Sequence, residues 1–411
     1  MEATIRFMSV FLPVWNQWFC VSTYLNRWET HDVMNILFFI GNIILMSLVG
    51  VSARECDVDA KYGNNEEECS LRTMNFLFAG ARMWVLLFEM IVAYYNWGKA
   101  YMAIMIYFMT FDAMVVVSWL VAGSIVQSDS CDESNMSQGC YYSFVFFWWL
   151  GIGLDIVKIM GNAISAKFGL FSRLQGIPIN VALAAERQEL FIVISIGELM
   201  AAALNHADFE GEANSYALTS LAVLMAALIK IRYFDFAVHP TASGNETTTR
   251  SHAMRTAPLR GMGYVLCHIP LNASIVMLGA NMDVILSERE GVHSEVLVAA
   301  CNCVAVIIFT CSTIDLLHSN GDSKAANKPT VAIVNGVFIV LALMLHNIKD
   351  FSHDSLSYLG YLSIILLGNV CGTHQMSQSR IKVKKCTKVT KAFDSSLSAQ
   401  SVNSEEPTAQ S

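Results

Sequence analysis

Seven ionisable residues lie inside long apolar stretches of this sequence, where a charge needs a specific reason to be present. They are Arg82, Glu89, Asp112, Asp155, Lys158, Glu198 and His268. A charged side chain at the centre of a bilayer costs about 2.5 kcal/mol or more. Each of these residues therefore needs an ion-pair partner, a water-filled cavity or a part in moving protons or ions.

Two sets of these residues have the spacing of structural ion pairs. Asp155 and Lys158 are three positions apart and can pair directly on one helix. Arg82 and Glu89 are seven positions apart, or about two turns, so they share a helix face. We expect both sets to form ion pairs, within a helix or between helices, that hold the helix packing in register, with a role in transport as the alternative.

Asp112 and Glu198 have no basic residue three or four positions away on their own helices. Glu198 lies near the middle of an apolar span that runs from about Leu190 to His206. A carboxyl group at that depth can exchange protons or bind a cation, and we expect this of Glu198. The alternative is a packing carboxyl whose hydrogen bonds are satisfied by neighbouring helices.

Arg187 precedes Glu198 by eleven residues, which is close to three helical turns, so the two lie about 16 Å apart on one face. This spacing suits Arg187, with Glu186 beside it, at a cytoplasmic mouth and Glu198 at a site in the middle of the membrane. The same spacing fits equally well a row of buried residues that lies along one helix face and serves only in packing.

Asp112 is a further candidate for an ion path, and so is His268. Pro270 follows it within the same apolar segment, where a proline frees a backbone carbonyl and tends to kink the helix. A lone histidine on a helix is more often a hydrogen-bonded packing residue than a proton relay, and both roles stay open here.

The motifs of an enzyme are missing from the sequence. Ser195 is the serine nearest to a candidate acid, and no Gly-x-Ser-x-Gly motif surrounds it. The cysteines lack the spacing of metal ligands, and no glycine-rich phosphate loop is present. We therefore expect neither an enzyme nor a bound metal or cofactor.

The elements that position these residues are transmembrane helices. The chain has 411 residues, of which 54% are hydrophobic and 15% charged, against roughly a quarter charged in soluble domains. Apolar segments long enough to cross a membrane recur along the whole chain. We place them at about 5–24, 32–53, 72–95, 99–122, 141–163, 188–206, 214–232, 258–284, 294–316, 328–346 and 355–372. The predicted fold is an all-α, polytopic transmembrane bundle of about 11 helices (10–12).

The basic residues predict the orientation of this bundle. Most of the Lys and Arg residues fall in alternate loops and in the C-terminal tail, which the positive-inside rule assigns to the cytoplasm. The N-terminus is then outside. The basic residues left on the outer side are Arg6, Arg54, Lys61, Arg72, Arg289 and Lys349.

Two of the predicted outer loops contain a pair of cysteines each. Cys56 with Cys69, and Cys131 with Cys140, can form disulfides in an oxidising compartment, and free thiols are the alternative. The other cysteines are expected to be small packing residues in or beside helices.

Asn135 begins a glycosylation sequon in one of the outer loops.

The ends of the predicted domain follow from composition. The transmembrane domain is expected to cover 1–374, followed by a disordered cytoplasmic tail over 375–411 that is first basic and then rich in serine.

Several motifs resemble those of the low temperature requirement A (LtrA) family. The most specific is Glu186-Arg187-Gln188-Glu189-Leu190-Phe191 followed by Ile196-Gly197-Glu198. The other stretches that fit the family are Asn26-Arg27-Trp28 with Thr30 and Asp32, Tyr233-Phe234-Asp235, and His268-Ile269-Pro270-Leu271 with Gly279. Their order and spacing agree from about Tyr24 to Cys371.

Members of that family usually begin with a further helix that carries a Glu-Leu-Phe-Phe-Asp motif. No such motif stands at the start of this sequence, so the resemblance implies a eukaryotic-type member that lacks the family's first helix. It also implies a multi-pass membrane protein linked by name to growth in the cold, and it supplies no substrate.

Three functions fit these observations. We expect a secondary transporter or channel for protons or small cations, with the lipid bilayer and a small ion as partners. The alternative is a non-transporting scaffold or a lipid-related cold-adaptation factor whose polar residues join helices. A receptor-like sensor fits less well because no loop is long enough for an ectodomain. The net charge of −8, with basic residues confined to loops and a tail, speaks against nucleic acid.

Overall fold

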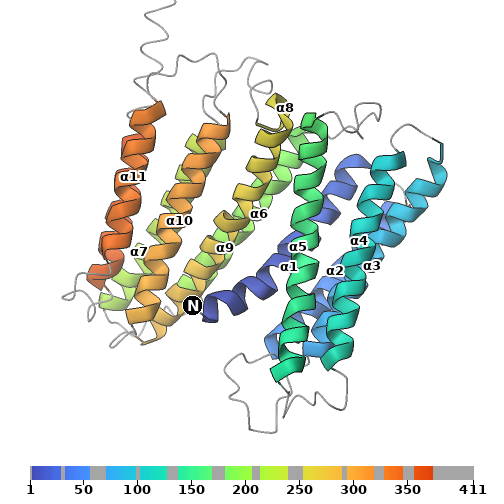
Figure 1. Cartoon of the computed structure of the whole chain (residues 1–411). Helices are drawn as coiled ribbons and strands as arrows, with labels where there is room; N and C mark the ends of the chain where they lie inside the picture. Colours follow the sequence, from blue (N-terminus) through green and yellow to red (C-terminus); the bar gives the residue numbers. More distant parts are fainter. Residues whose placement is uncertain are drawn as a thin grey trace, which may run out of the picture. The chain divides into compact units, whose positions relative to one another are not determined.

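The computed structural model describes eleven stretches of the chain, and all of them are helical. They cover 2–28, 33–55, 71–98, 102–126, 138–168, 181–205, 213–238, 253–288, 294–318, 328–345 and 356–373. Within these residues the helices are α1 (Glu2–Arg27), α2 (Val33–Glu55), α3 (Leu71–Tyr95), α4 (Met102–Val126), α5 (Gln138–Phe168), α6 (Val181–Asn205), α7 (Ala213–Lys230), η3 (Ile231–Val238), α8 (Ala253–Thr256), α9 (Pro258–Glu288), α10 (Ser294–His318) and α11 (Lys328–Leu345), shown in Figure 1. A last helix covers Leu356–Thr373.

Each predicted segment coincides with a helix, so the all-α class of the fold is confirmed. Among the described residues, nine helices are long and apolar enough to cross a membrane, and the chain is an integral, multi-pass membrane protein. Helix α1 falls outside this set because it carries polar residues such as Asn16 and Gln17, and the apolar part of α11 is shorter, Ala332–Leu345. The sidedness of the termini stays a prediction.

The chain divides into two compact units. Unit 1 comprises Met1–Ser195 and Asn245–Ala273, and unit 2 comprises Ile196–Gly244 and Ser274–Ser411. Helices α6 and α9 therefore contribute to both units.

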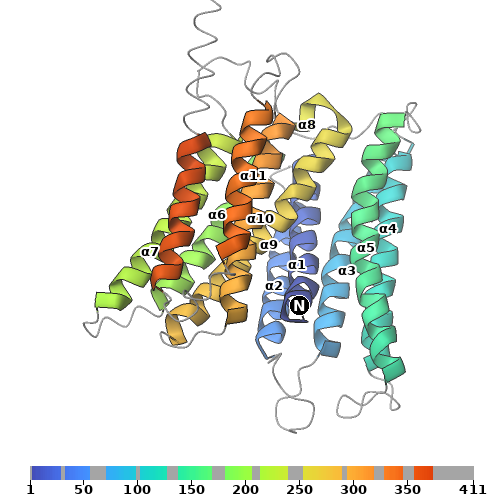
Figure 2. The same ribbon diagram turned by 60° about the vertical axis from the view of Figure 1, so that its left-hand side comes forward.

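Unit 1 is organised around α3, which packs against α2 on one side and α4 on the other, while α5 packs against α4 (Figures 1 and 2). Helix α1 contacts α2, α3 and α5. Aromatic rings fill one part of the core, where Phe78 of α3 contacts Trp119 of α4 and Trp148 of α5. Such pairs contribute about 0.5–1.5 kcal/mol beyond the area they bury, so these rings help hold the three helices together.

The exposed side chains of α2 indicate that this face of unit 1 lies in lipid. Ile36, Leu37, Phe39, Ile40 and Ile43 are each 47% exposed or more. Apolar side chains in such an unbroken row are an aggregation liability in water but are the normal surface of a helix in lipid. The inner side of the same helix carries Asn42, which is buried. Polar groups inside and apolar groups outside identify α2 as a helix that faces the bilayer.

Unit 2 is built on α10, which packs against α11 and η3, and η3 continues directly from α7. Helices α6 and α9 approach closely in this unit at Gly279. A Cβ added there would lie 3.2 Å from the Leu199 Cα, so a side chain at this position would push against backbone. Small residues permit this kind of close helix packing in membranes.

Candidate functional site

The middle of unit 1 holds charged residues from three neighbouring helices. Arg82 lies near the midpoint of α3, Asp112 near that of α4, and Asp155 and Lys158 near that of α5. Because α4 packs between α3 and α5, residues at the middle of each helix meet at one depth. Their exposed fractions are 0%, 1%, 1% and 4% in the same order.

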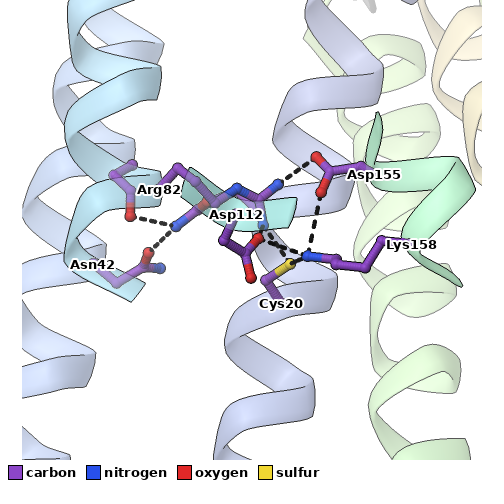
Figure 3. A network of polar contacts seen from close by, with 8 residues as sticks. Cys20, Asn42, Arg82, Asp112, Asp155 and Lys158 are labelled. Atoms are coloured by element: carbon purple, nitrogen blue, oxygen red, sulfur yellow. Dashed lines mark hydrogen bonds and ion pairs between the residues drawn. The ribbon is translucent and has the colours of Figure 1, made fainter. Parts of the chain in front are cut away.

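These four side chains form a closed ring in which each cation contacts both acids (Figure 3). The Arg82 guanidinium lies 2.6 Å from Asp155 Oδ2 through Nη2 and 3.3 Å from Asp112 Oδ1 through Nη1. The Lys158 ammonium lies 2.6 Å from Asp112 Oδ1 and 3.3 Å from Asp155 Oδ1. We call these four residues the charge ring.

The charge ring has no net charge when all its members are ionised. Burial of an ion is tolerable only when opposite charges and hydrogen bonds replace water around it. Hydrogen bonding in the ring is incomplete among the described residues, since Asp155 Oδ1 and Arg82 Nε make no hydrogen bond, although Asp155 Oδ1 lies within ion-pair distance of Lys158. A proton can therefore be accepted at Asp155 Oδ1 without a hydrogen bond being broken.

The predicted local pair of Asp155 and Lys158 is present in the ring. Arg82 forms ion pairs between helices, with Asp112 and Asp155, rather than a pair with Glu89 within α3. Glu89 instead lies within side-chain hydrogen-bonding reach of Asp112 and interacts electrostatically with Lys158 and Arg27. Two carboxyl groups can share a hydrogen bond only if one carries a proton, so this pair is suited to hold one.

Asp112, a candidate for the ion path, has no basic residue three or four positions away on its own helix. The structure supplies partners from both neighbouring helices, as Arg82 comes from α3 and Lys158 from α5. Arg27, at the end of α1, lies over the Phe108 ring at 4.7 Å from its centroid and interacts with Glu89 and Asp112. With Arg27 and Glu89 included, three acids face three bases.

Cys20 of α1 lies against both cations of the charge ring. The sequence analysis did not identify it as a site residue and treated it as a small packing residue. Its sulfur accepts a hydrogen bond from Arg82 Nη1 and lies 3.5 Å from Lys158 Nζ. Nothing in the pattern of α1 distinguishes Cys20 from other buried cysteines. The position becomes notable only when α1 is packed against α3 and α5.

The Cys20 sulfur and the carboxylate oxygens of Asp112 and Asp155 lie within 4.8 Å of one another, the arrangement of a three-ligand metal site. The Arg82 and Lys158 cations already contact all three ligand groups. A metal ion at these ligand atoms would have to compete with both Arg82 and Lys158.

Hydrogen bonds next to Arg82 join the ring to α1 and α2. Gln17 Nε2 donates to Asn42 Oδ1 at 2.9 Å and to the carbonyl oxygen of Ala81 at 3.0 Å. Figure 3 shows Asn42 beside the ring at this point. The backbone that carries Arg82 is therefore tied to two further helices, which limits how far the guanidinium can move.

The ion-path candidates on α6 lie outside the charge ring, and two of them are exposed rather than buried. Glu198 lies in unit 2 and is exposed, Glu186 is exposed, and Arg187 is partly buried with an Nε atom that makes no hydrogen bond within the described residues. A carboxyl group that is exposed on a membrane helix needs contact with water or protein, so Glu198 stays a candidate for proton or ion access.

His268 is fully buried in α9, where its Nδ1 lies 2.7 Å from the carbonyl oxygen of Tyr264 and its ring packs against the Tyr264 ring. One turn later Asn272 donates to the His268 carbonyl oxygen at 2.8 Å and accepts a hydrogen bond from Ser195 at 2.9 Å. The bond between Ser195 and Asn272 joins α6 to α9 one turn from His268, and the choice between a packing role and a proton relay for His268 stays a prediction.

The remaining candidate residues fall into two groups. Glu189 and Gly197 lie on α6, Tyr233 is buried in η3, and the backbone of Asp235 belongs to η3. Asp32, Cys56, Cys69, Cys131, Asn135, the tail over 375–411 and the side chains of Cys140 and Asp235 lie outside the described residues.

Comparison with known proteins gives one match. The sequence model of the family described as bacterial low temperature requirement A protein (LtrA) matches residues 1–365, out of 411. No curated protein and no solved structure matches the chain. The family match spans every residue of the charge ring.

Proposed function

We propose that this chain, which belongs to the low temperature requirement A (LtrA) family, is a secondary transporter or channel for protons or small cations, with the charge ring of unit 1 as its coupling site. The proposal assigns no covalent chemistry to the chain and therefore no enzymatic step.

The observation that carries the proposal is the position of Asp112. Its carboxylate holds two internal cations, Lys158 at 2.6 Å and Arg82 at 3.3 Å, and a third acid, Glu89, is within hydrogen-bonding reach. A proton on the Glu89 and Asp112 pair therefore decides how much negative charge faces Lys158. Intramembrane acids arranged in this way mark proton and ion routes in other membrane proteins.

The charge balance of the ring couples proton binding to a change in helix packing. When Asp112 takes the proton, the ring changes from neutral to a net charge of +1 at a place with almost no exposure. That charge is costly in a low-dielectric interior, so Lys158 or one of the helices that carry the ring must move. Proton binding thereby changes the packing of α3, α4 and α5, the kind of change that alternating access requires.

Glu198 has a role separate from that of the charge ring. It is exposed on α6, outside the ring and outside unit 1. We assign it to proton or ion access rather than to coupling. Its substitution should then change the rate of flux without changing which ion is moved.

The experiment is ion flux in proteoliposomes. Proton and monovalent-cation uptake would be compared for the wild-type protein, Asp112→Asn and Glu198→Gln at matched incorporation. The proposal expects flux in the wild type, loss of coupled flux in Asp112→Asn and slower flux in Glu198→Gln. Absence of flux in the wild-type protein, under both an imposed proton gradient and an imposed cation gradient, would reject it.

Because each cation of the ring pairs with both acids, one other function is also favoured, a membrane scaffold without transport. In a scaffold the four charges only fix the register of α3, α4 and α5. The variants then change thermal stability alone, and no gradient drives flux in any of them.

A further inference from the structure

The Lys158 ammonium group lies among three groups that are all possible metal ligands. Its Nζ is 2.6 Å from Asp112 Oδ1 and 3.3 Å from Asp155 Oδ1. The Cys20 sulfur is 3.5 Å from the same nitrogen, and Figure 3 shows the three contacts converging there. The cation at the centre of this cluster is thus a side chain of the protein itself.

The three ligand groups are close enough together for one metal ion. They come from α1, α4 and α5, and their ligand atoms lie within 4.8 Å of one another. In a tetrahedral zinc site, with Zn–S near 2.3 Å and Zn–O near 2.0 Å, the ligand atoms are about 3.5 Å apart. The cluster therefore has to contract by little more than about 1 Å, which rotations of the side chains can provide once the ammonium leaves.

Asp155 Oδ1 supports a cation site independently of the cluster's shape. Its residue is 1% exposed, and this oxygen makes no hydrogen bond with the described residues. The other oxygen, Oδ2, is held by Arg82 at 2.6 Å. A metal ion that takes the place of Lys158 can therefore bind Oδ1 without breaking a hydrogen bond and without displacing Arg82 from Asp155.

The Cys20 sulfur selects the class of metal. Magnesium and calcium bind oxygen ligands, whereas thiolate sulfur binds zinc and other soft or borderline transition metals. A set of one thiolate and two carboxylates is therefore suited to a divalent transition-metal ion.

The charge balance of the site agrees with a divalent ion. When Lys158 withdraws, two carboxylates and the Arg82 guanidinium leave a net charge of −1. Cysteine binds a metal as thiolate, so Cys20 releases its proton on binding and the charge becomes −2. A divalent ion then restores the neutrality that a buried group of charges needs.

Arg82 can remain in place when the ion binds. It donates hydrogen bonds to Cys20 and to Asp155 Oδ2, and its backbone neighbour Ala81 is tied to α1 through Gln17. Hydrogen bonds of this kind to the ligands of a metal orient them and tune the metal.

We propose that Cys20, Asp112 and Asp155 form a binding site for a divalent transition-metal ion, with Lys158 as a tethered cation that the ion replaces. The inference rests on the proposed transport function and names its ion, which is a transported substrate rather than a resident cofactor. Asp112 cannot carry a proton and bind the metal through the same oxygen, so protons and metal ions exclude each other in the ring.

The test is a titration of the purified, reduced full-length protein with Co²⁺, followed by absorption spectroscopy. A thiolate bound to Co²⁺ gives a charge-transfer band, which the wild-type protein is expected to show saturably. Zn²⁺ should remove the band, and Mg²⁺ should not. Cys20→Ser should lose it, whereas Cys371→Ser, at an exposed cysteine of the last helix, should keep it.

A second pair of variants tests the role of Lys158. Lys158→Met removes the tethered competitor and should tighten Co²⁺ binding by about tenfold or more, because a tethered group competes at a high effective concentration. Lys230→Met makes the same substitution at an exposed lysine of α7 and should leave the affinity unchanged. If Lys158→Met fails to fold, Cys20→Ser and Cys371→Ser still decide.

Three results would overturn the proposal: no saturable band in the wild type, an equal band in Cys20→Ser, or unchanged affinity in folded Lys158→Met. The binding test needs no flux, so it can fail separately from the proposed transport function. Co²⁺ binding without flux in proteoliposomes would reject transport and keep the metal site. Flux without a Cys20-dependent band would reject the metal site alone.

Discussion

Lys158 lies closer to the acid of the neighbouring helix than to the acid of its own. Its Nζ is 2.6 Å from Asp112 on α4 and 3.3 Å from Asp155, which is one turn away on α5. The shorter contact crosses the interface between α4 and α5, so it fixes the register of the two helices in a way that a pair within one helix cannot.

The first prediction concerns that contact. Asp112→Asn leaves Lys158 and Arg82 buried with one counter-ion fewer, and should lower the free energy of unfolding by about 3–5 kcal/mol. The double variant Asp112→Asn with Lys158→Met removes one charge of each sign and should recover much of the loss. Thermal unfolding in detergent measures both. If the two substitutions are additive, the contact does not contribute to stability.

A second prediction separates the roles of arginine and lysine in the ring. Arg82 uses two nitrogens to reach two acids and also donates to Cys20, which a single ammonium group cannot reproduce. Arg82→Lys should therefore lower the unfolding temperature although the charge is retained. Arg187→Lys, on a partly buried arginine outside the ring, is the matched control and should have a smaller effect. Equal shifts would show that charge alone matters at position 82.

Thiol labelling gives a third prediction. Cys20 is buried between two cationic side chains, whereas Cys371 is exposed at the end of the last helix. A membrane-permeant maleimide should label Cys371 first and Cys20 only after unfolding, because reaction requires access to the sulfur. Mass spectrometry of the labelled protein identifies the site. Rapid labelling of Cys20 in the folded protein would mean that the ring is open to small molecules.

The fourth prediction tests the close approach of α6 and α9 in unit 2. Gly279→Ala places a methyl group 3.2 Å from the Leu199 Cα and should destabilise the protein by about 1–3 kcal/mol. Gly336→Ala on α11 meets nothing within 4 Å, so it should be neutral or stabilising by up to about 1 kcal/mol. Unfolding temperatures of the two variants provide the comparison. A stabilised Gly279→Ala would contradict the packing at this contact.

The sequence alone determined the helices, because an apolar run of about 20 residues has only one stable structure in lipid. It also predicted the neighbours Asp155 and Lys158, since residues three apart on a helix meet whatever surrounds them. Partners on other helices depend on which faces pack together, and spacing along the chain does not contain that information. Tertiary structure therefore decided that Arg82 contacts Asp112 and Asp155 rather than Glu89, and that Cys20 lies at the centre of the ring. The same holds for Arg232, whose partners come from α10 and the last helix, more than eighty residues further along the chain.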